Sequence, residues 1–324
     1  MKHGKYSQGA VRLAAFLLTA SAALATSNTV QAHGIAGNRF FPGTLNFDDP
    51  AVADEFALTT GTLQQPVDGL MATNNGATLS FARLLTPTWS IGMDTGYLRR
   101  NLAGVRQAGA TGTDLVLKTR LVEEDLSETL VATSLTYGFA GTGSQRLGAN
   151  GPATLTPTLD VGQGFGALPD SLAWLRPIGV TGAVSANVPL SSTSSNLSYD
   201  FNQAQYTRIR SRNATTLHWG FAVEYSPLYL TDRFQPGVLP KEEPLHQFIP
   251  LVEFAFDSPR GRKTTGTANP GISYVKDSWQ LAAEAVVPLS RESGHGIGLN
   301  IQVLFFMDDF MPKVFGKPLL KTGL

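Results

Sequence analysis

The chain has 324 residues, with 25 Lys and Arg against 25 Asp and Glu, and it has no cysteine. The absence of cysteine excludes a disulfide framework and any cysteine-based metal site. The balanced charge provides no basic field for nucleic acid, so we expect no nucleic-acid partner.

The first residues have the composition of a secretory signal peptide. Lys2, Lys5 and Arg12 are basic, 13–24 is apolar, and small residues end at Ala32. Such a pattern predicts export and cleavage after Ala32, so we assign 1–32 to the signal peptide. No later apolar run is long enough for a membrane helix, which leaves a soluble all-β protein or an outer-membrane barrel.

Residues 33–54 are predicted to form a periplasmic N-terminal segment. Asp49 followed by Pro50 is typical of a helix start, since aspartate caps the first turn and proline suits the first helical position. We therefore expect a short helix here, in the lumen or on the periplasmic rim. Asp48, Asp49, Asp54 and Glu55 could ligate a cation, but a capped and solvated helix end is the favoured interpretation. No metal or cofactor is predicted.

Alternating apolar and polar residues predict a series of β-strands, because side chains two apart share one face of a strand. The predicted strands are 55–63, 77–85, 89–97, 114–121, 131–139, 154–161, 178–188, 217–225, 248–257, 272–275, 279–287 and 297–305. The longer rows match a tilted strand that crosses a bilayer, and twelve is an even number, as single-chain bacterial barrels require. The predicted fold is all-β, a transmembrane antiparallel β-barrel of about 12 strands over 55–307.

The connections set the expected topology, with both ends of the chain in the periplasm and 308–324 as a periplasmic C-terminal tail. The loops expected on the extracellular side are 64–76, 99–112, 141–152, 189–213, 258–266 and 289–295. A short helix is expected around 172–175, and Pro157 predicts an edge or a bulge in its strand. Trp and Tyr collect near the predicted strand ends, which favours a membrane barrel over a soluble sandwich. Arg83 interrupts an apolar row and is expected to snorkel to the interface.

Strand parity places a set of titratable side chains on the inward face. The predicted lumen-lining residues are Asp94, Asp114, Lys118, Arg120, Asp160, His218, Glu224, Glu253 and Glu284. Isolated buried charges are unfavourable, so they must pair or stay hydrated, and Asp94 is expected to pair with Lys118 or Arg120. Two interpretations remain open: a hydrated pore with a mild cation preference, which we favour, and a polar plug that holds the barrel shut.

No catalytic signature is present, and we expect no enzymatic activity. The sequence has no Gly-x-Ser-x-Gly, no His-Glu-x-x-His and no phosphate loop. Lipid-hydrolysing barrels carry a His and a Ser on the lipid-facing wall, whereas His218 is predicted to face inward and Gly220 lies two places on. Without a nucleophile in reach, no catalytic residue is assigned.

The C-terminal third resembles a known family. The segments that carry the resemblance are Asn269-Pro270-Gly271-Ile272-Ser273-Tyr274, Trp279-Gln280-Leu281, Glu284-Ala285 and Val287-Pro288, with Gly164-Phe165-Gly166 and Leu168-Pro169-Asp170 earlier. They resemble the meta-pathway phenol-degradation outer-membrane protein family, over about 265–307. The resemblance implies an outer-membrane passive channel or transporter for small aromatic or hydrophobic solutes, with membrane lipid and solute as partners. The alternative is a closed barrel with a structural or surface-binding role.

Overall fold

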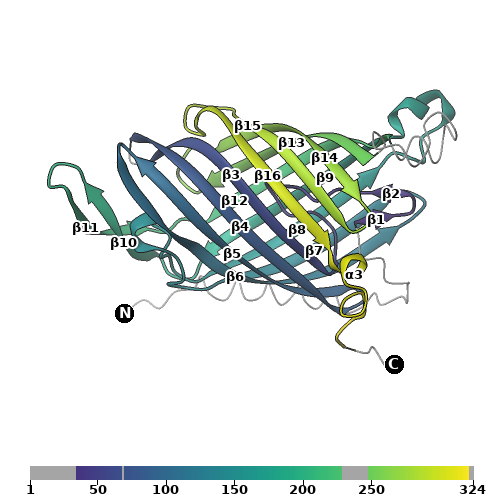
Figure 1. Cartoon of the computed structure of the whole chain (residues 1–324), viewed down its shortest axis with the longest axis horizontal. Helices are drawn as coiled ribbons and strands as arrows, with labels where there is room; N and C mark the ends of the chain where they lie inside the picture. The colour runs from purple at the N-terminus through teal and green to yellow at the C-terminus, as the bar shows by residue number, and fades with distance from the viewer. Residues whose placement is uncertain (1–33, 68, 228–246, 321–324) are drawn as a thin grey trace.

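Twelve strands close into one antiparallel barrel in the computed structural model, which describes residues 34–67, 69–227 and 247–320 (Figure 1). The barrel strands are β3 (Glu55–Val67), β4 (Leu70–Thr86), β5 (Trp89–Leu102), β6 (Val105–Glu124), β7 (Thr129–Gly138), β8 (Thr154–Gly164), β9 (Ile178–Pro189), β12 (Thr216–Tyr225), β13 (Phe248–Pro259), β14 (Thr265–Lys276), β15 (Trp279–Pro288) and β16 (His295–Phe306). The predicted fold is confirmed, and every predicted strand is present in the predicted order. The predicted signal peptide lies outside the described residues.

Two of the predicted loops are wrong, because the strands around them continue. Of the residues assigned to these loops, 64–67, 70–76, 99–102 and 105–112 belong to β3 to β6, and a tight turn joins β5 to β6. Ala103 and Gly104 both have positive φ, 47° and 89°, which is the backbone of a two-residue hairpin turn. These strand ends are rich in Gly and Asn and lack the apolar alternation of the middle segments, so periodicity alone could not find them.

The predicted loop 189–213 holds a β-hairpin that projects beyond the barrel (Figure 1). Its strands are β10 (Thr193–Asp200) and β11 (Gln205–Arg212). Tyr199 packs edge-on against Tyr206 with ring centroids 5.2 Å apart. The stretch has the Ser and Asn content of a loop, and the hairpin depends on cross-strand pairing that this composition does not reveal.

Pro157 lies inside β8 and produces neither an edge nor a bulge. The register with β9 is the same on both sides of it, from Leu155 opposite Val188 to Thr158 opposite Ser185, with the ladder interrupted between. A closed barrel has no edge strand, so the missing proline N–H is accommodated as a local gap in one ladder.

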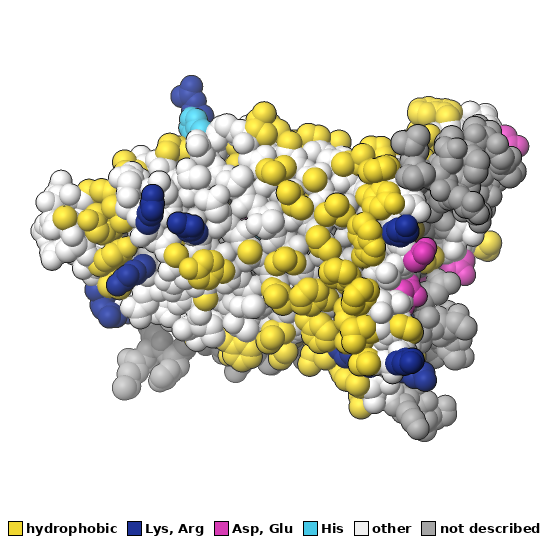
Figure 2. Space-filling view, viewed as in Figure 1, with side chains coloured by type: hydrophobic (Ala, Val, Ile, Leu, Met, Phe, Trp, Pro, Cys, Tyr) yellow, Lys and Arg dark blue, Asp and Glu magenta, His cyan; other side chains and the backbone are white. Residues whose placement is uncertain are grey.

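The outer wall carries a band of apolar side chains, and one face of it is visible in Figure 2. Members of this band, between 38% and 49% exposed, are Leu79, Met93, Leu115, Leu159, Val184, Phe221, Ile272, Leu281 and Leu299. Their neighbours along the strands, such as Ala222, Gln280 and Ala282, are buried on the inner face. The predicted alternation of apolar outward and polar inward residues is therefore confirmed.

The N-terminal segment begins at one end of the barrel. We call the end where β3 begins and β16 stops the terminal end, and the opposite end the distal end. A small hairpin, β1 (Ile35–Ala36) with β2 (Arg39–Phe40), lies at the terminal end. The side chain of Arg39 is buried there, with Nη1 donating to the Pro177 carbonyl at 2.8 Å and Nε 3.5 Å from Glu128.

The helix predicted after Asp49 is absent. Asp49 Oδ1 accepts a hydrogen bond from the Ala51 amide at 2.8 Å, but the chain then runs extended into β3. An aspartate that caps a single turn has the same local sequence as a helix N-cap, which explains the error. The short helix predicted around 172–175 is present as the 3-10 helix η2 (Asp170–Leu175).

The C-terminal tail folds back over the arginine that interrupts the apolar row. Arg83 Nη1 donates to Asp54 Oδ2 at 2.6 Å, and Nη2 donates to the carbonyls of Val314 and Lys317. Its guanidinium also lies 4.6 Å from the Phe315 ring centroid. The structure therefore neutralises and covers Arg83, where snorkelling was expected.

Asp54 joins three parts of the chain at this point. Besides Arg83, it accepts the amide of Leu84 in β4 at 2.6 Å and the amide of Gly316 in the tail at 2.7 Å. The tail follows the one-turn helix α3 (Met307–Phe310). We call Asp54, Arg83 and the 314–317 backbone the clasp.

Replacing Asp54 with alanine should loosen the tail, because it removes the acceptor of three donors, one of them a guanidinium. We expect a loss of about 1–3 kcal/mol in the free energy of unfolding and faster proteolysis of the tail. Asp277→Ala, which removes the same charge at an exposed turn of the same end, is the control. Equal protection of the tail in the two variants would contradict the role of the clasp.

Candidate functional site

Residues 43–49, which we call the tip, enter the barrel and cross its interior. Glu253 in β13 accepts hydrogen bonds from the Leu45 amide at 2.9 Å, the Asn46 amide at 3.1 Å and Asn46 Nδ2 at 2.8 Å. Asn46 Nδ2 also donates to Glu284 in β15 at 2.7 Å. Both glutamates lie at the middle of their strands, so the tip reaches mid-height in the barrel.

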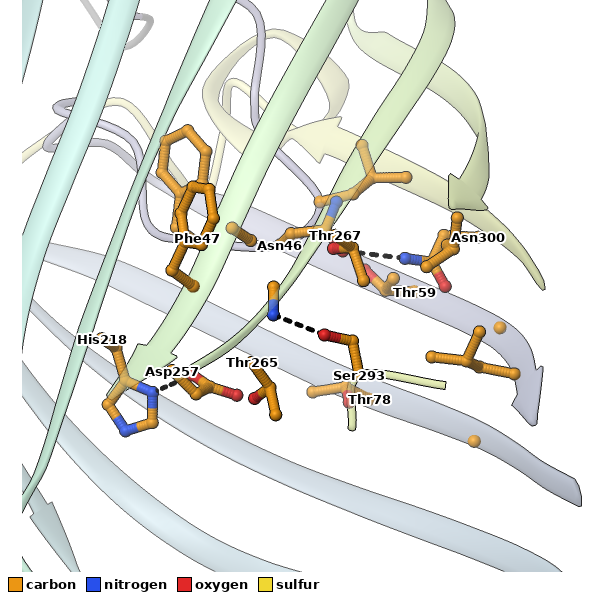
Figure 3. Close-up of a pocket in the computed structure, with 18 of the residues that line it drawn as sticks. Asn46, Phe47, Thr59, Thr78, His218, Asp257, Thr265, Thr267, Ser293 and Asn300 are labelled. Atoms are coloured by element: carbon orange, nitrogen blue, oxygen red, sulfur yellow. Dashed lines mark hydrogen bonds and ion pairs between the residues drawn. The ribbon is translucent and has the colours of Figure 1, made fainter. Parts of the chain in front are cut away.

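Amide side chains hold the tip on the same side. Gln280 and Gly43 exchange two hydrogen bonds of 3.1 and 2.9 Å, as paired peptide groups do in a sheet. Asn300 Nδ2 donates to Asn46 Oδ1 at 3.0 Å, a contact drawn in Figure 3. The tip therefore lies in the barrel interior, although it belongs to the segment 33–54 that was predicted to be periplasmic.

The opposite wall contacts the tip through one lysine. Lys118 Nζ in β6 lies 3.0 Å from Asp48 Oδ2 and 3.9 Å from Asp160 Oδ2, and it donates to the Asp49 carbonyl. Burial raises the pKa of Asp49 to about 6, although the Lys118 ammonium opposes this shift. The tip is thus anchored by hydrogen bonds to one wall and by a cation on the other.

One glycine makes room for the aromatic ring of the tip. A Cβ added at Gly220 in β12 would lie 2.7 Å from Cδ1 of Phe47, closer than side chains tolerate. Phe47 can therefore pack directly on the backbone of β12 only because this position has no side chain. This packing contact holds the tip against β12, in addition to the hydrogen bonds that the tip makes with the wall.

Two cavities lie on either side of the tip. The distal cavity has a volume of about 600 Å³ and the terminal cavity about 510 Å³. Both are lined by the tip residues 45–48, and both also contact Thr59, Thr78 and Thr158. The two cavities therefore border each other between the tip and these three threonines of β3, β4 and β8.

The distal cavity has a mixed lining (Figure 3). His218 Nδ1 lies 2.5 Å from Asp257 Oδ1, with both side chains partly exposed to the cavity. The inward positions of Leu63, Leu98 and Val286 add apolar surface to the same space. A solute with one polar edge and one apolar face would find both kinds of contact here.

The structure brings some of the predicted lumen-lining residues together and separates others. Lys118 and Asp160 form an ion pair, and Glu253 and Glu284 share Asn46. Glu224 is 2% exposed and packs against Gly179 instead.

The remaining predicted residues lie apart from the tip contacts. Asp94 lines the terminal cavity and faces Asp114 across the β5–β6 ladder. Arg120 pairs with Glu123 at 2.6 Å. The expected pairing of Asp94 with Lys118 or Arg120 is therefore not made.

Sequence reasoning missed the partners of these groups. Asn46 and Phe47 carry no signal of their own, since the tip resembles an ordinary polar loop in sequence. Strand parity does place Gln280, Asn300 and Thr158 on the inward face. Among the described residues there is no cluster of three or more His, Asp or Glu that could hold a metal ion. No helix in the described part is long and apolar enough to span a membrane.

Comparison with known proteins supports the architecture. No family model and no curated protein matches the chain. The solved COG4313 outer membrane channel from Pseudomonas putida F1 is 14% identical with a TM-score of 0.51, covering 82% of this chain and 99% of that one. The KdgM porin is 11% identical with a TM-score of 0.41, covering 78% and 98%. At this identity the likeness to the COG4313 channel shows the fold, a closed antiparallel β-barrel.

Proposed function

We propose that this protein is a passive outer-membrane channel for small solutes that combine a polar and an apolar surface, small aromatic compounds among them. The observation that carries the proposal is the pair of cavities of about 600 and 510 Å³ that meet at Thr59, Thr78 and Thr158. A solute would pass from one cavity to the other between these threonines and the tip. Hydroxyl groups along the path can replace part of the hydration that the solute loses.

The outer wall supports the membrane location. Exposed apolar residues alternate with buried polar ones along the strands, as expected where the wall contacts hydrocarbon. The first residue of the barrel, Glu55, and its last residue, Phe306, both lie at the terminal end, which would face the periplasm. The distal end, with the β10–β11 hairpin, would then face outward.

The distal cavity supports the class of solute. Phe47 and Leu98 supply apolar contacts beside the polar pair of His218 and Asp257. A purely ionic solute would gain little from the apolar side chains, and a purely apolar one would leave the polar groups unsatisfied. The resemblance to a family linked with aromatic degradation points to the same class.

Conductance in planar bilayers tests the path. We expect the protein to give small, discrete conductance steps. Thr78→Trp should reduce the step size severalfold, because the indole would fill the space between the threonines and the tip. Leu79→Trp is the matched control, since the next residue points outward and lies 38% exposed on the wall. Vesicle swelling with phenol, compared with glucose, tests the solute class. Equal conductance of the two variants would contradict the proposed path.

A second candidate, a closed barrel with a structural or surface-binding role, is favoured by the tip itself. Hydrogen bonds to Glu253, Gln280 and Asn300 hold it at mid-height. If the full protein gives no conductance in bilayers but conducts after removal of the tip, the closed-barrel role is supported instead. Silence in both forms would exclude the channel altogether.

A further inference from the structure

A basic pocket lies on the outer wall of the barrel, at the distal end of β4, β5 and β6. It has a volume of about 240 Å³, and it is lined by Arg100 together with Arg99, Arg106, Thr73, Asn75 and Asn101. The ladders pair Asn75 with Arg99, Thr73 with Asn101, and Asn101 with Arg106. Residues paired directly across a ladder share one face of the sheet, so these five side chains form one surface.

This surface points away from the lumen. Arg99 follows the exposed, outward-facing Tyr97 by two residues, and alternation keeps them on the same face. Arg100, the next residue, has the opposite parity and donates to Asn74 and to the Leu147 carbonyl. Arg100 also lines the pocket, but the pocket shares no lining residue with either cavity of the proposed channel.

Nothing nearby neutralises the two arginines. Both Arg99 and Arg106 are exposed, and among the described residues neither forms an ion pair. Between residues 69 and 113 the sequence contains one acid, Asp94, and that residue lines the terminal cavity inside the barrel. A concave site with two unpaired guanidinium groups, flanked by a hydroxyl and two amides, has the chemistry of a phosphate site.

The pocket also lies at a defined height on the wall. Directly below it along the same strands are Tyr97, Met93 and Leu79, which are 55%, 49% and 38% exposed. Figure 2 shows basic side chains on the wall toward the β10–β11 end, beyond the apolar band. An aromatic residue at the edge of an apolar band marks the level of the lipid headgroups. The two arginines stand just outside that level.

We propose that this pocket binds the phosphorylated headgroup of an outer-leaflet lipid, with its acyl chains against Met93 and Leu79. The proposal rests on the membrane location and distal orientation given above. Two guanidinium groups that line one pocket can hold the oxygens of one phosphate group, such as a phosphate of lipid A. Arg99 and Arg106 bind the phosphate oxygens, and Thr73, Asn75 and Asn101 donate from the sides.

Titration of the purified, detergent-solubilised protein with bisphosphorylated lipid A, read by native mass spectrometry, tests the proposal. We expect Arg99→Gln with Arg106→Gln to weaken lipid binding by about tenfold to a hundredfold, because charge-assisted hydrogen bonds to phosphate are lost. Arg208→Gln with Arg210→Gln is the matched control, since it removes two exposed arginines from the β10–β11 hairpin. Arg99→Lys with Arg106→Lys should retain part of the affinity.

The source of the phosphate is tested in the same experiment. A large excess of inorganic phosphate should leave the lipid bound, since it cannot reproduce the acyl contacts. Displacement by inorganic phosphate, or equal loss of lipid in both arginine pairs, would overturn the proposal. Conductance of the Arg99 and Arg106 variant should equal that of the parent, so failure of lipid binding is distinct from failure of the channel function.

Discussion

Replacing residues 43–49 with a short Gly-Ser linker is expected to raise single-channel conductance severalfold. The tip separates the two cavities and reaches mid-height in the barrel, so its removal merges them into one continuous passage. The barrel ladders do not depend on the tip, and heat-modifiable migration on a gel should be unchanged. A planar-bilayer recording of both forms under the same salt gives the ratio directly.

A single substitution should produce a weaker form of the same effect. Glu253→Gln leaves one carbonyl oxygen where two carboxylate oxygens accepted three donors, and its new NH₂ faces the tip amides. We expect frequent brief steps that are larger than the small conductance steps of the parent. Glu224→Gln is the control, since in the described structure Glu224 makes no hydrogen bond to the tip. Identical recordings from both variants would show that Glu253 does not hold the tip.

Val184→Arg is expected to destabilise the barrel by about 2–4 kcal/mol, as for an arginine at the bilayer midplane on the lipid face. Val184 lies at the middle of β9 and is 42% exposed in the outer band. Ser185→Arg should be tolerated far better, because Ser185 lines the distal cavity, where an arginine can remain hydrated. Equal shifts of the two variants in a lipid-refolding titration with urea would contradict the in–out assignment.

The barrel wall could be predicted because its pattern is physically forced. A strand between lipid and lumen must alternate, and each middle segment, such as 217–225 within β12, shows that alternation in sequence. The strand extensions beyond the apolar band, such as 99–102 of β5, do not lie between lipid and lumen. Their sequence need not alternate, and its pattern therefore predicts loops. The hairpin β10–β11 was missed for the same reason.

In the barrel interior, the sequence predicts only the wall residues that face inward, and it does not predict the segment that contacts them. Parity in β13 and β15 placed Glu253 and Glu284 on the inner face, but it could not supply their partner. Asn46 lies more than 200 positions away from both glutamates in the chain. Contacts of that separation arise from the closed topology and leave no periodic trace in either segment. Arg83 is a parallel case, since its acid, Asp54, lies before the first barrel strand.

The clasp bears on the order in which the barrel assembles. β3 and β16 are the first and last barrel strands, and their ladder joins the residues most distant in sequence, so its loop-closure entropy is the largest in the sheet. Asp54 immediately precedes β3, whereas Met307 and Gly316, which donate to its carbonyl and carboxylate, follow β16. These bonds can form only when the two ends of the sheet have met. Protection of the tail is therefore a reporter of ring closure, and its appearance during refolding dates the last step of assembly.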